Sequence, residues 1–187
     1  MPHNADHFFV ITGGPGSGKT TLIDALARVG FPVAAEVGRD IIKEQMLIQG
    51  KALPWIDPSL FAEIMLSREM QSHRFHAGRQ ENVFFDRGVP DVAGYLRLLG
   101  HAVPDHVMRA VASFRYNRKA FICPPWPEIF RQDEERKQTM DEAIRTYQAM
   151  MATYADCGYE LAEVPRASVD DRLAFILASA RPATGTD

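Results

Sequence analysis

Cysteine is scarce in this sequence, with only Cys123 and Cys157 among 187 residues. The two are far apart and form no CxxC pair, so the sequence has neither a disulfide framework nor a zinc-type pattern. A chain of this length buries roughly 70% of the surface that it exposes when unfolded, so it needs no covalent or metal crosslink to fold. We therefore expect a protein of the reducing cytoplasm.

Long apolar runs are also lacking. No segment approaches the run of about 18 apolar residues that a transmembrane helix requires, and residues 1–7 lack the basic and then apolar pattern of a secretory signal. The sequence thus predicts a protein that is neither exported nor inserted in a membrane. We expect residues 1–7 and 181–187 to be flexible ends.

A strong net charge is missing too, because 21 basic and 24 acidic residues leave a formal charge of −3. Such a chain has no overall positive field to attract nucleic acid or an anionic membrane surface. The basic residues are 5 lysines and 16 arginines. The planar fork of arginine suits phosphate, so this bias favours phosphate handling, although an arginine-rich genome explains it equally well.

Five short apolar segments alternate with stretches of helical periodicity. The predicted strands are residues 8–11, 31–36, 83–85, 120–122 and 159–164. The predicted helices are residues 20–29, 39–49, 57–79, 89–99, 104–114, 140–154 and a last one that begins after Ser168. This alternation predicts one α/β domain over residues 8–180, a doubly wound five-stranded parallel sheet with helices on both faces. The very polar stretch at about 124–139 predicts a small helical lid.

A glycine-rich segment follows the first predicted strand and matches the phosphate-loop pattern GxxxxGK[ST] at every fixed position. Glycines allow a tight turn whose N–H groups, together with the positive end of the next helix, can hold phosphate oxygens. Lys19 should reach the β and γ phosphates, and the Thr20 hydroxyl should bind Mg²⁺. The predicted nucleotide-binding residues are Gly13, Gly14, Pro15, Gly16, Ser17, Gly18, Lys19, Thr20 and Thr21.

Asp86 directly follows the third predicted strand. In an open parallel sheet, ligands bind at the carboxyl ends of the strands, so this carboxylate should lie beside the phosphate loop. Magnesium sites in such proteins use one or two carboxylates together with phosphate oxygens. We therefore expect Asp86 and Thr20 to hold the metal ion.

With these motifs the chain resembles the P-loop kinases, and most specifically the small predicted ATPases related to nicotinamide-riboside kinase domains. The phosphate loop is the specific part of this resemblance. The remaining matches are short: Glu36 and Arg39 after the second strand, Asp86-Arg87-Gly88 after the third, and arginines in the lid. Deoxynucleoside kinases are a more distant likeness, since they have an acidic-Arg-Ser triplet where this chain has Asp86-Arg87-Gly88.

The resemblance implies roles for several of these side chains. A carboxylate after the second strand commonly acts as base toward the acceptor hydroxyl, which here would be Glu36, with Arg39 and Arg87 bordering the acceptor. An equally weighted alternative is that Glu36 only caps the helix that follows it.

The lid and the segment after the last strand complete the implied site. Arg131 and Arg136 would be lid arginines that stabilise the charge of the transferred phosphoryl group, with surface ion pairs as the alternative. Pro165 lies where such kinases surround adenine. Since the chain has no NKxD-like guanine reader, ATP is preferred to GTP.

The sequence as a whole predicts an ATP- and Mg²⁺-dependent kinase. Its partner would be a small hydroxyl-bearing phosphate acceptor, for which a nucleoside-like molecule is one candidate, and the enzyme would be a monomer or homodimer. The alternative is an ATP-operated regulatory switch or ATPase with a protein partner, in which bound ATP orders the lid. A ring-forming motor ATPase fits less well, because 187 residues leave little room for an additional helical subdomain.

Overall fold

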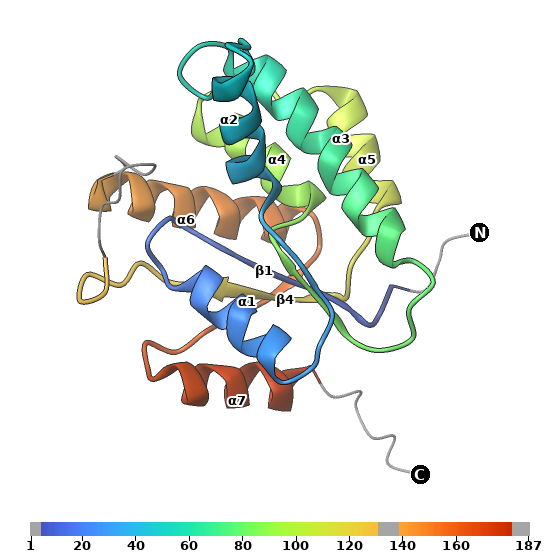
Figure 1. Ribbon diagram of the computed structural model, residues 1–187, viewed down its shortest axis with the longest axis vertical. Coiled ribbons are helices and arrows are strands. Elements are labelled where there is room, and N and C mark those ends of the chain that lie inside the picture. Colours follow the sequence, from blue (N-terminus) through green and yellow to red (C-terminus); the bar gives the residue numbers. More distant parts are fainter. Residues whose placement is uncertain (1–4, 131–138, 181–187) are drawn as a thin grey trace.

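The computed structural model describes residues 5–130 and 139–180, shown in Figure 1. The strands are β1 (Phe8–Gly13), β2 (Val33–Ala34), β3 (Val83–Asp86), β4 (Lys119–Cys123) and β5 (Glu160–Glu163). The helices are α1 (Lys19–Arg28), α2 (Val37–Leu47), α3 (Pro58–His76), α4 (Val89–Leu98), α5 (Asp105–Ser113), α6 (Met140–Asp156) and α7 (Val169–Ser179).

The five strands form one parallel sheet in the order β2-β3-β1-β4-β5. The central strand β1 pairs with β3 on one side, where Ile11 lies opposite Asp86, and with β4 on the other, where Gly13 lies opposite Cys123. The expected doubly wound α/β fold is therefore confirmed. Because parallel strands end at the same edge, the segments that follow β1 and β3 become neighbours.

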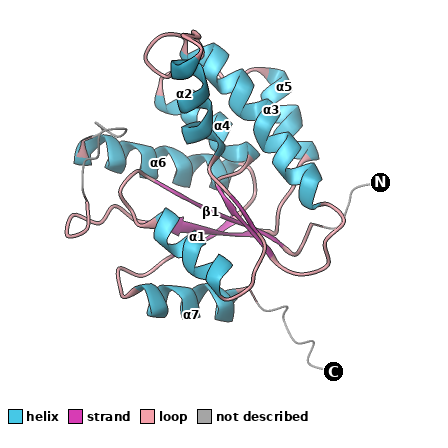
Figure 2. Ribbon diagram, viewed as in Figure 1, coloured by secondary structure: helices cyan, strands magenta, loops and turns pink. Residues whose placement is uncertain are grey.

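Both faces of the sheet are buried beneath helices, as Figure 2 shows. Along β1, Phe8 and Val10 belong to one apolar cluster, while Phe9 and Ile11 belong to the other. This follows from the period of two along a strand, and it explains why β1 reads as a continuous apolar run. Helices α1 and α7 contact one another on one face, and on the opposite face α4 contacts each of α3, α5 and α6.

The predicted elements all exist, but some of their bounds differ. Strand β2 is limited to Val33–Ala34 because it is an edge strand that pairs only with β3. Helix α2 begins at Val37, two residues earlier than expected, and α3 ends at His76, three residues earlier. At the other end of the chain, Ser168 caps α7 by accepting a hydrogen bond from the Asp171 N–H at 3.2 Å, as its sequence predicts.

The ends and the lid are described only in part. Ala5 is already buried in the core, three residues ahead of the expected start of the domain. Half of the expected lid, residues 131–138 with Arg131 and Arg136, lies outside the described residues. Within 5–130 and 139–180, no helix has both the length and the apolar character needed to cross a membrane.

We predict that Gly13→Ala destabilises the fold far more than Gly30→Ala does. Both glycines have positive φ, 134° and 95°, where an alanine costs about 1–2 kcal/mol. A Cβ at Gly13 would also lie 2.4 Å from the Cys123 carbonyl oxygen, whereas a Cβ at Gly30 would have no atom within 4 Å. Urea unfolding should show an additional loss of about 1–3 kcal/mol for Gly13→Ala. Equal losses would show that the β1–β4 contact accommodates the methyl group.

Candidate functional site

The turn between β1 and α1 is held by hydrogen bonds to its own carbonyl groups. The Gly14 carbonyl accepts from the Ser17 hydroxyl at 2.8 Å and from Lys19 Nζ at 3.1 Å. Gly16 and Gly18 adopt φ of 68° and 75°, a region that glycine enters without strain. The turn is therefore tight, and side chains of Ser17 and Lys19 satisfy its Gly14 carbonyl.

Helix α1 begins at Lys19, so the turn leads directly into a helix N-terminus. The first N–H groups of a helix have no partner within the helix, and the helix dipole favours negative charge there. The end of the turn and the first residues of α1 line part of a cavity of about 560 Å³. Its walls are Gly16, Ser17, Gly18, Lys19, Thr20, Thr21, Arg39, Trp126, Ile129, Ala167, Ser168, Val169 and Arg172.

The lining of the cavity combines polar and apolar residues. Lys19 and Thr20 carry groups that suit phosphate oxygens or a cation bound to them. Trp126 and Ile129 are apolar, and Ile129 lies beside Gly18, since a Cβ at Gly18 would be 3.2 Å from it. The cavity can thus hold a ligand that has both an anionic and an apolar part.

Lys19 and Asp86 are buried together beside the turn, with 3% and 4% of their surfaces exposed. Burial lowers the pKa of the Lys19 ammonium and Arg87 adds to this effect, while Asp86 and Glu36 oppose it. Burial raises the pKa of the Asp86 carboxyl, and the Lys19 ammonium opposes that rise. The Oδ1 atom of Asp86 is buried without a hydrogen-bond partner in the described part of the chain.

The unpartnered oxygen of Asp86 and the Thr20 hydroxyl fit a Mg²⁺ ion that takes its other ligands from phosphate and water. Among residues 5–130 and 139–180, no three His, Cys, Asp or Glu side chains gather into a cluster that could hold a metal ion by themselves. A Mg²⁺ ion at this position would therefore need a phosphate-bearing ligand.

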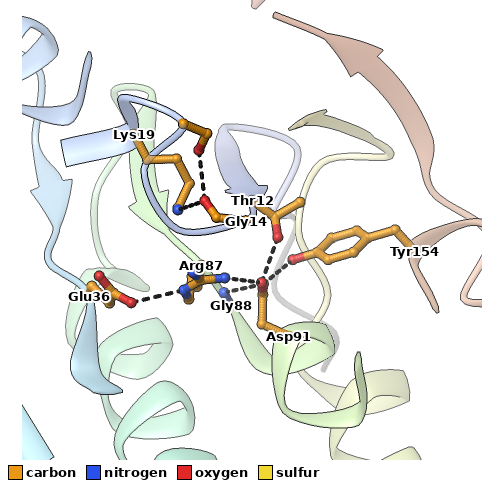
Figure 3. A network of polar contacts seen from close by, with 9 residues as sticks. Thr12, Gly14, Lys19, Glu36, Arg87, Gly88, Asp91 and Tyr154 are labelled. Carbon is orange, nitrogen blue, oxygen red and sulfur yellow. Dashed lines mark hydrogen bonds and ion pairs between the residues drawn. The ribbon is translucent and has the colours of Figure 1, made fainter. Parts of the chain in front are cut away.

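A chain of ion pairs continues from this point across the edge of the sheet (Figure 3). Arg87 directly follows β3 and has a positive φ of 75°. Its Nε donates to Glu36 Oε1 at 3.0 Å, and one terminal nitrogen donates to Asp91 Oδ1 at 3.2 Å. Burial alone would lower the pKa of Arg87, but Glu36, Asp91 and Asp86 together outweigh it and raise the value.

Asp91 is the centre of this network. Besides Arg87, its carboxylate accepts from the Thr12 hydroxyl at 2.5 Å, the Gly88 N–H at 3.0 Å and the Tyr154 hydroxyl at 2.6 Å. These donors come from β1, the start of α4 and α6, so one carboxylate connects three elements. The sequence marks Asp91 only as the third residue of α4, where acids are favoured, and gives no sign of the partners from β1 and α6.

The two hypotheses for Glu36 can now be compared with its position. It does occupy the N-cap position of α2, but its side chain forms no capping hydrogen bond. Instead it pairs with Arg87 while being 18% exposed. The Glu36 carboxylate is thus oriented by a cation and lies within electrostatic range of Lys19, as the role of base requires.

The structure separates the two arginines that the sequence placed around the acceptor. Arg39 lines the cavity beside the phosphate-loop residues, whereas Arg87 belongs to the ion-pair network. Pro165 is not among the residues that line the cavity; the lining residues come two positions later, at Ala167 to Val169. The loop after β5 thus reaches the cavity only as it approaches α7, and adenine binding at Pro165 stays a prediction.

Besides Asp91, the sequence analysis missed the buried charged residues Glu69 and Arg172, with 4% and 2% of their surfaces exposed. Glu69 lies within α3, where helical periodicity gives no reason to separate it from Glu63, the exposed acid of the same helix. Arg172 lies in α7 and donates to the carbonyl groups of Ser17 and Gly18. No sequence signal connects a residue of the last helix to the first turn.

Comparisons with known proteins concern the family and the α/β fold of this chain. A protein family described as "AAA domain" matches residues 8–172. No curated protein sequence matches the chain.

Among solved structures, the NadR protein in complex with NR is similar, with a TM-score of 0.67 and 16% identity, over 95% of this chain and 50% of NadR. NadR in complex with NAD and AMP-PNP is similar to the same degree, with 49% of that chain covered. Deoxyadenosine kinase from M. mycoides, with products dCMP and a flexible dCDP, has a TM-score of 0.63 and 14% identity, over 92% of this chain and 97% of the kinase. This chain thus spans about half the length of NadR, and the likeness concerns the fold.

We predict that Glu69→Gln stabilises the protein increasingly as the pH rises from about 4.5 to neutrality. Burial, followed by repulsion from Asp91, raises the pKa of Glu69 well above its ordinary value of 4.5. Above pH 4.5 the unfolded chain loses this proton while the folded chain keeps it, so wild-type stability falls as the pH rises. The amide cannot ionise and avoids this loss.

Chemical denaturation between pH 4 and pH 8 measures this difference. Glu63→Gln, the same change at an exposed position of α3, serves as the control and should show only a small difference. A Glu69→Gln stability difference that does not vary with pH would contradict the assignment.

Proposed function

Since this chain belongs to the AAA-domain family and is a P-loop kinase-like NTPase in fold, we propose that it is an ATP- and Mg²⁺-dependent phosphotransferase. Its acceptor would be a small hydroxyl-bearing molecule of nucleoside-like character. The family description names a domain type and no reaction, so the proposal depends on the geometry of the site.

One observation carries the proposal: Ile11 of β1 lies opposite Asp86 at the end of β3, and Arg87, the next residue, pairs with Glu36 at 3.0 Å. The turn that leads from β1 to Lys19, the candidate metal ligand and the candidate base therefore come from neighbouring segments at the edge of the sheet where β1 and β3 end. Phosphoryl transfer needs this convergence, because the acceptor oxygen must lie in line with the γ phosphate while the charge around it is neutralised.

The nucleotide would occupy the cavity with its phosphates at the start of α1 and its base near Trp126. Backbone N–H groups and the Lys19 ammonium would bind phosphate oxygens, and burial would strengthen these contacts because the surroundings screen charge poorly. Thr20 and Asp86 would hold Mg²⁺, which when bound neutralises charge on the β and γ phosphates. Arg39, also on the cavity wall, adds a second cation for the phosphate chain.

Glu36 would accept the proton of the acceptor hydroxyl at its carboxylate. The hydrogen bond from Arg87 Nε to Oε1 fixes the orientation of this group, and Asp91 in turn holds Arg87. The acceptor would thus lie between the phosphate cavity and the ion-pair network. Arg131 and Arg136 remain predicted lid arginines of this proposal.

The nucleoside-like acceptor is supported by the fold neighbours. One neighbour is a deoxyadenosine kinase in complex with its nucleotide products. Another, NadR, is in complex with NR. A NadR complex also contains AMP-PNP, an ATP analogue, which supports ATP as the phosphate donor.

The proposal is tested by incubating the protein with labelled ATP, Mg²⁺ and a panel of nucleosides, nicotinamide riboside and sugars. We expect ADP formation that depends on one class of acceptor and on Mg²⁺. Tight ATP binding without acceptor-dependent ADP would contradict a kinase. Nucleotide-dependent binding of a protein partner would then favour the regulatory switch.

We predict that Lys19→Ala abolishes turnover and weakens ATP binding. The buried ammonium has no replacement at the phosphate loop, so a loss of about 100-fold or more in kcat is expected. Calorimetry with ATP measures the affinity, and the labelled-ATP assay measures kcat. Lys51→Ala, at an exposed loop position, is the matched control and should behave as wild type. Full activity of Lys19→Ala would remove Lys19 from the site.

We predict that Glu36→Gln lowers kcat by about 100-fold or more while ATP affinity changes little, because the amide keeps the shape of the side chain but cannot accept the proton. Steady-state kinetics with varied ATP separates kcat from KM. The control is Glu44→Gln, the same change on α2 in an exposed ion pair with Arg68. An unchanged kcat for Glu36→Gln would exclude Glu36 as the base.

A further inference from the structure

Arg172 is a buried cation whose hydrogen bonds go to backbone and thiol groups. It lies in the first turns of α7 with 2% of its surface exposed. One terminal nitrogen donates to the Ser17 carbonyl at 3.0 Å and to Cys123 Sγ at 3.3 Å, and the other donates to the Gly18 carbonyl at 3.3 Å. A single guanidinium thus binds two consecutive carbonyl groups of the phosphate loop.

The peptide geometry gives these two bonds a consequence on the opposite side of the loop. The Ser17 carbonyl shares a peptide plane with the Gly18 N–H, and the Gly18 carbonyl shares one with the Lys19 N–H. The part of the chain that the structure describes contains no cis peptide bond, so in both planes the N–H points away from the carbonyl. Arg172 holds the Ser17 carbonyl, and together with the Leu22 N–H, which donates at 3.3 Å, it holds the Gly18 carbonyl. Both N–H groups are thereby directed to the side of the loop away from Arg172. Hydrogen bonding at a carbonyl also polarises its peptide group, which makes the N–H a stronger donor.

Arg172 has no carboxylate partner among residues 5–130 and 139–180, since none of the ion pairs there includes this side chain. Its Nε is buried without a hydrogen-bond partner, and the face of the Trp126 ring lies 5.5 Å from its guanidinium carbon. Arginine does not lose its proton in proteins. A buried charge without a counterion is unfavourable, and an anion in the adjacent cavity would supply the missing charge.

Gly18 gives independent support for the importance of this contact. A Cβ at Gly18 would lie 2.5 Å from one terminal nitrogen of Arg172. Glycine is therefore needed here for its positive φ and also for the close approach of the guanidinium.

We propose that Arg172 is a positioning residue of the phosphate loop, which orients the Gly18 and Lys19 N–H groups toward the phosphates of a nucleoside di- or triphosphate and adds positive charge behind them. It acts through the loop and does not touch the reacting atoms. This inference depends on the nucleotide binding of the proposed function, but it is independent of whether the phosphoryl group is then transferred.

The test measures binding without turnover. Calorimetry with ADP and with inorganic tripolyphosphate, which has the phosphate chain but no base, gives the affinity of the phosphate loop itself. For Arg172→Gln we expect about 10-fold weaker binding of both probes, since hydrogen bonds from a charged donor are lost. The control is Arg118→Gln, the same change at an exposed residue just before β4, and it should bind as wild type. Binding by Arg172→Gln that equals the wild-type affinity would overturn the proposal.

A second variant keeps the test decisive if Arg172→Gln does not fold. Arg172→Lys keeps the charge but lacks the fork that reaches two carbonyl groups, so we expect weaker binding than in wild type and shifted amide resonances for Gly18 and Lys19 without ligand. Wild-type affinity together with unshifted resonances would overturn the proposal.

The test also separates this proposal from that of a kinase. If the wild-type protein binds tripolyphosphate but phosphorylates no acceptor, the kinase assignment fails and the role of Arg172 is still measurable. If it binds neither ADP nor tripolyphosphate, both proposals are overturned.

Discussion

The site depends on how the carbonyl groups of the turn between β1 and α1 are satisfied. Ser17 and Lys19 donate to the Gly14 carbonyl, and Arg172 donates to the carbonyls of Ser17 and Gly18 farther along the turn. Each of these bonds fixes a peptide plane, so the N–H side of the turn is left for a ligand. The glycines permit the turn, but the donors around it determine which way its peptide groups face.

Charge is the second constraint. Lys19 is buried and Arg87 is partly buried among four carboxyl groups, those of Glu36, Glu69, Asp86 and Asp91. Asp91 and Glu36 are paired with Arg87, and hydrogen bonds from three elements further satisfy Asp91. Asp86 and Glu69 are held at a cost in stability, which is visible in their raised pKa values. Ionisable groups with shifted pKa values that gather at one edge of a sheet are typical of a functional site, because they do not stabilise the fold.

Much of this could be predicted because the signals are local. The phosphate loop is a run of neighbours in sequence, each strand is a short apolar segment, and Asp86 follows its strand directly. The structure accordingly brings the turn after β1 and Asp86 to the same edge of the sheet, where β1 and β3 end. Arg172 could not be predicted, since it donates to a residue 155 positions earlier in the chain. Glu69 could not either, because the pattern of α3 does not show which of its acids faces inward.

The sequence by itself determined the α/β alternation, the glycine turn and the identity of the residues at the strand ends, since backbone preferences and apolar periodicity act over a few neighbouring residues. The tertiary structure alone decided which side chains meet there. It paired Glu36 with Arg87, gave Asp91 its donors from β1 and α6, and brought α7 against the turn. Such contacts depend on the rotation and packing of whole helices on the sheet, which no short stretch of sequence encodes.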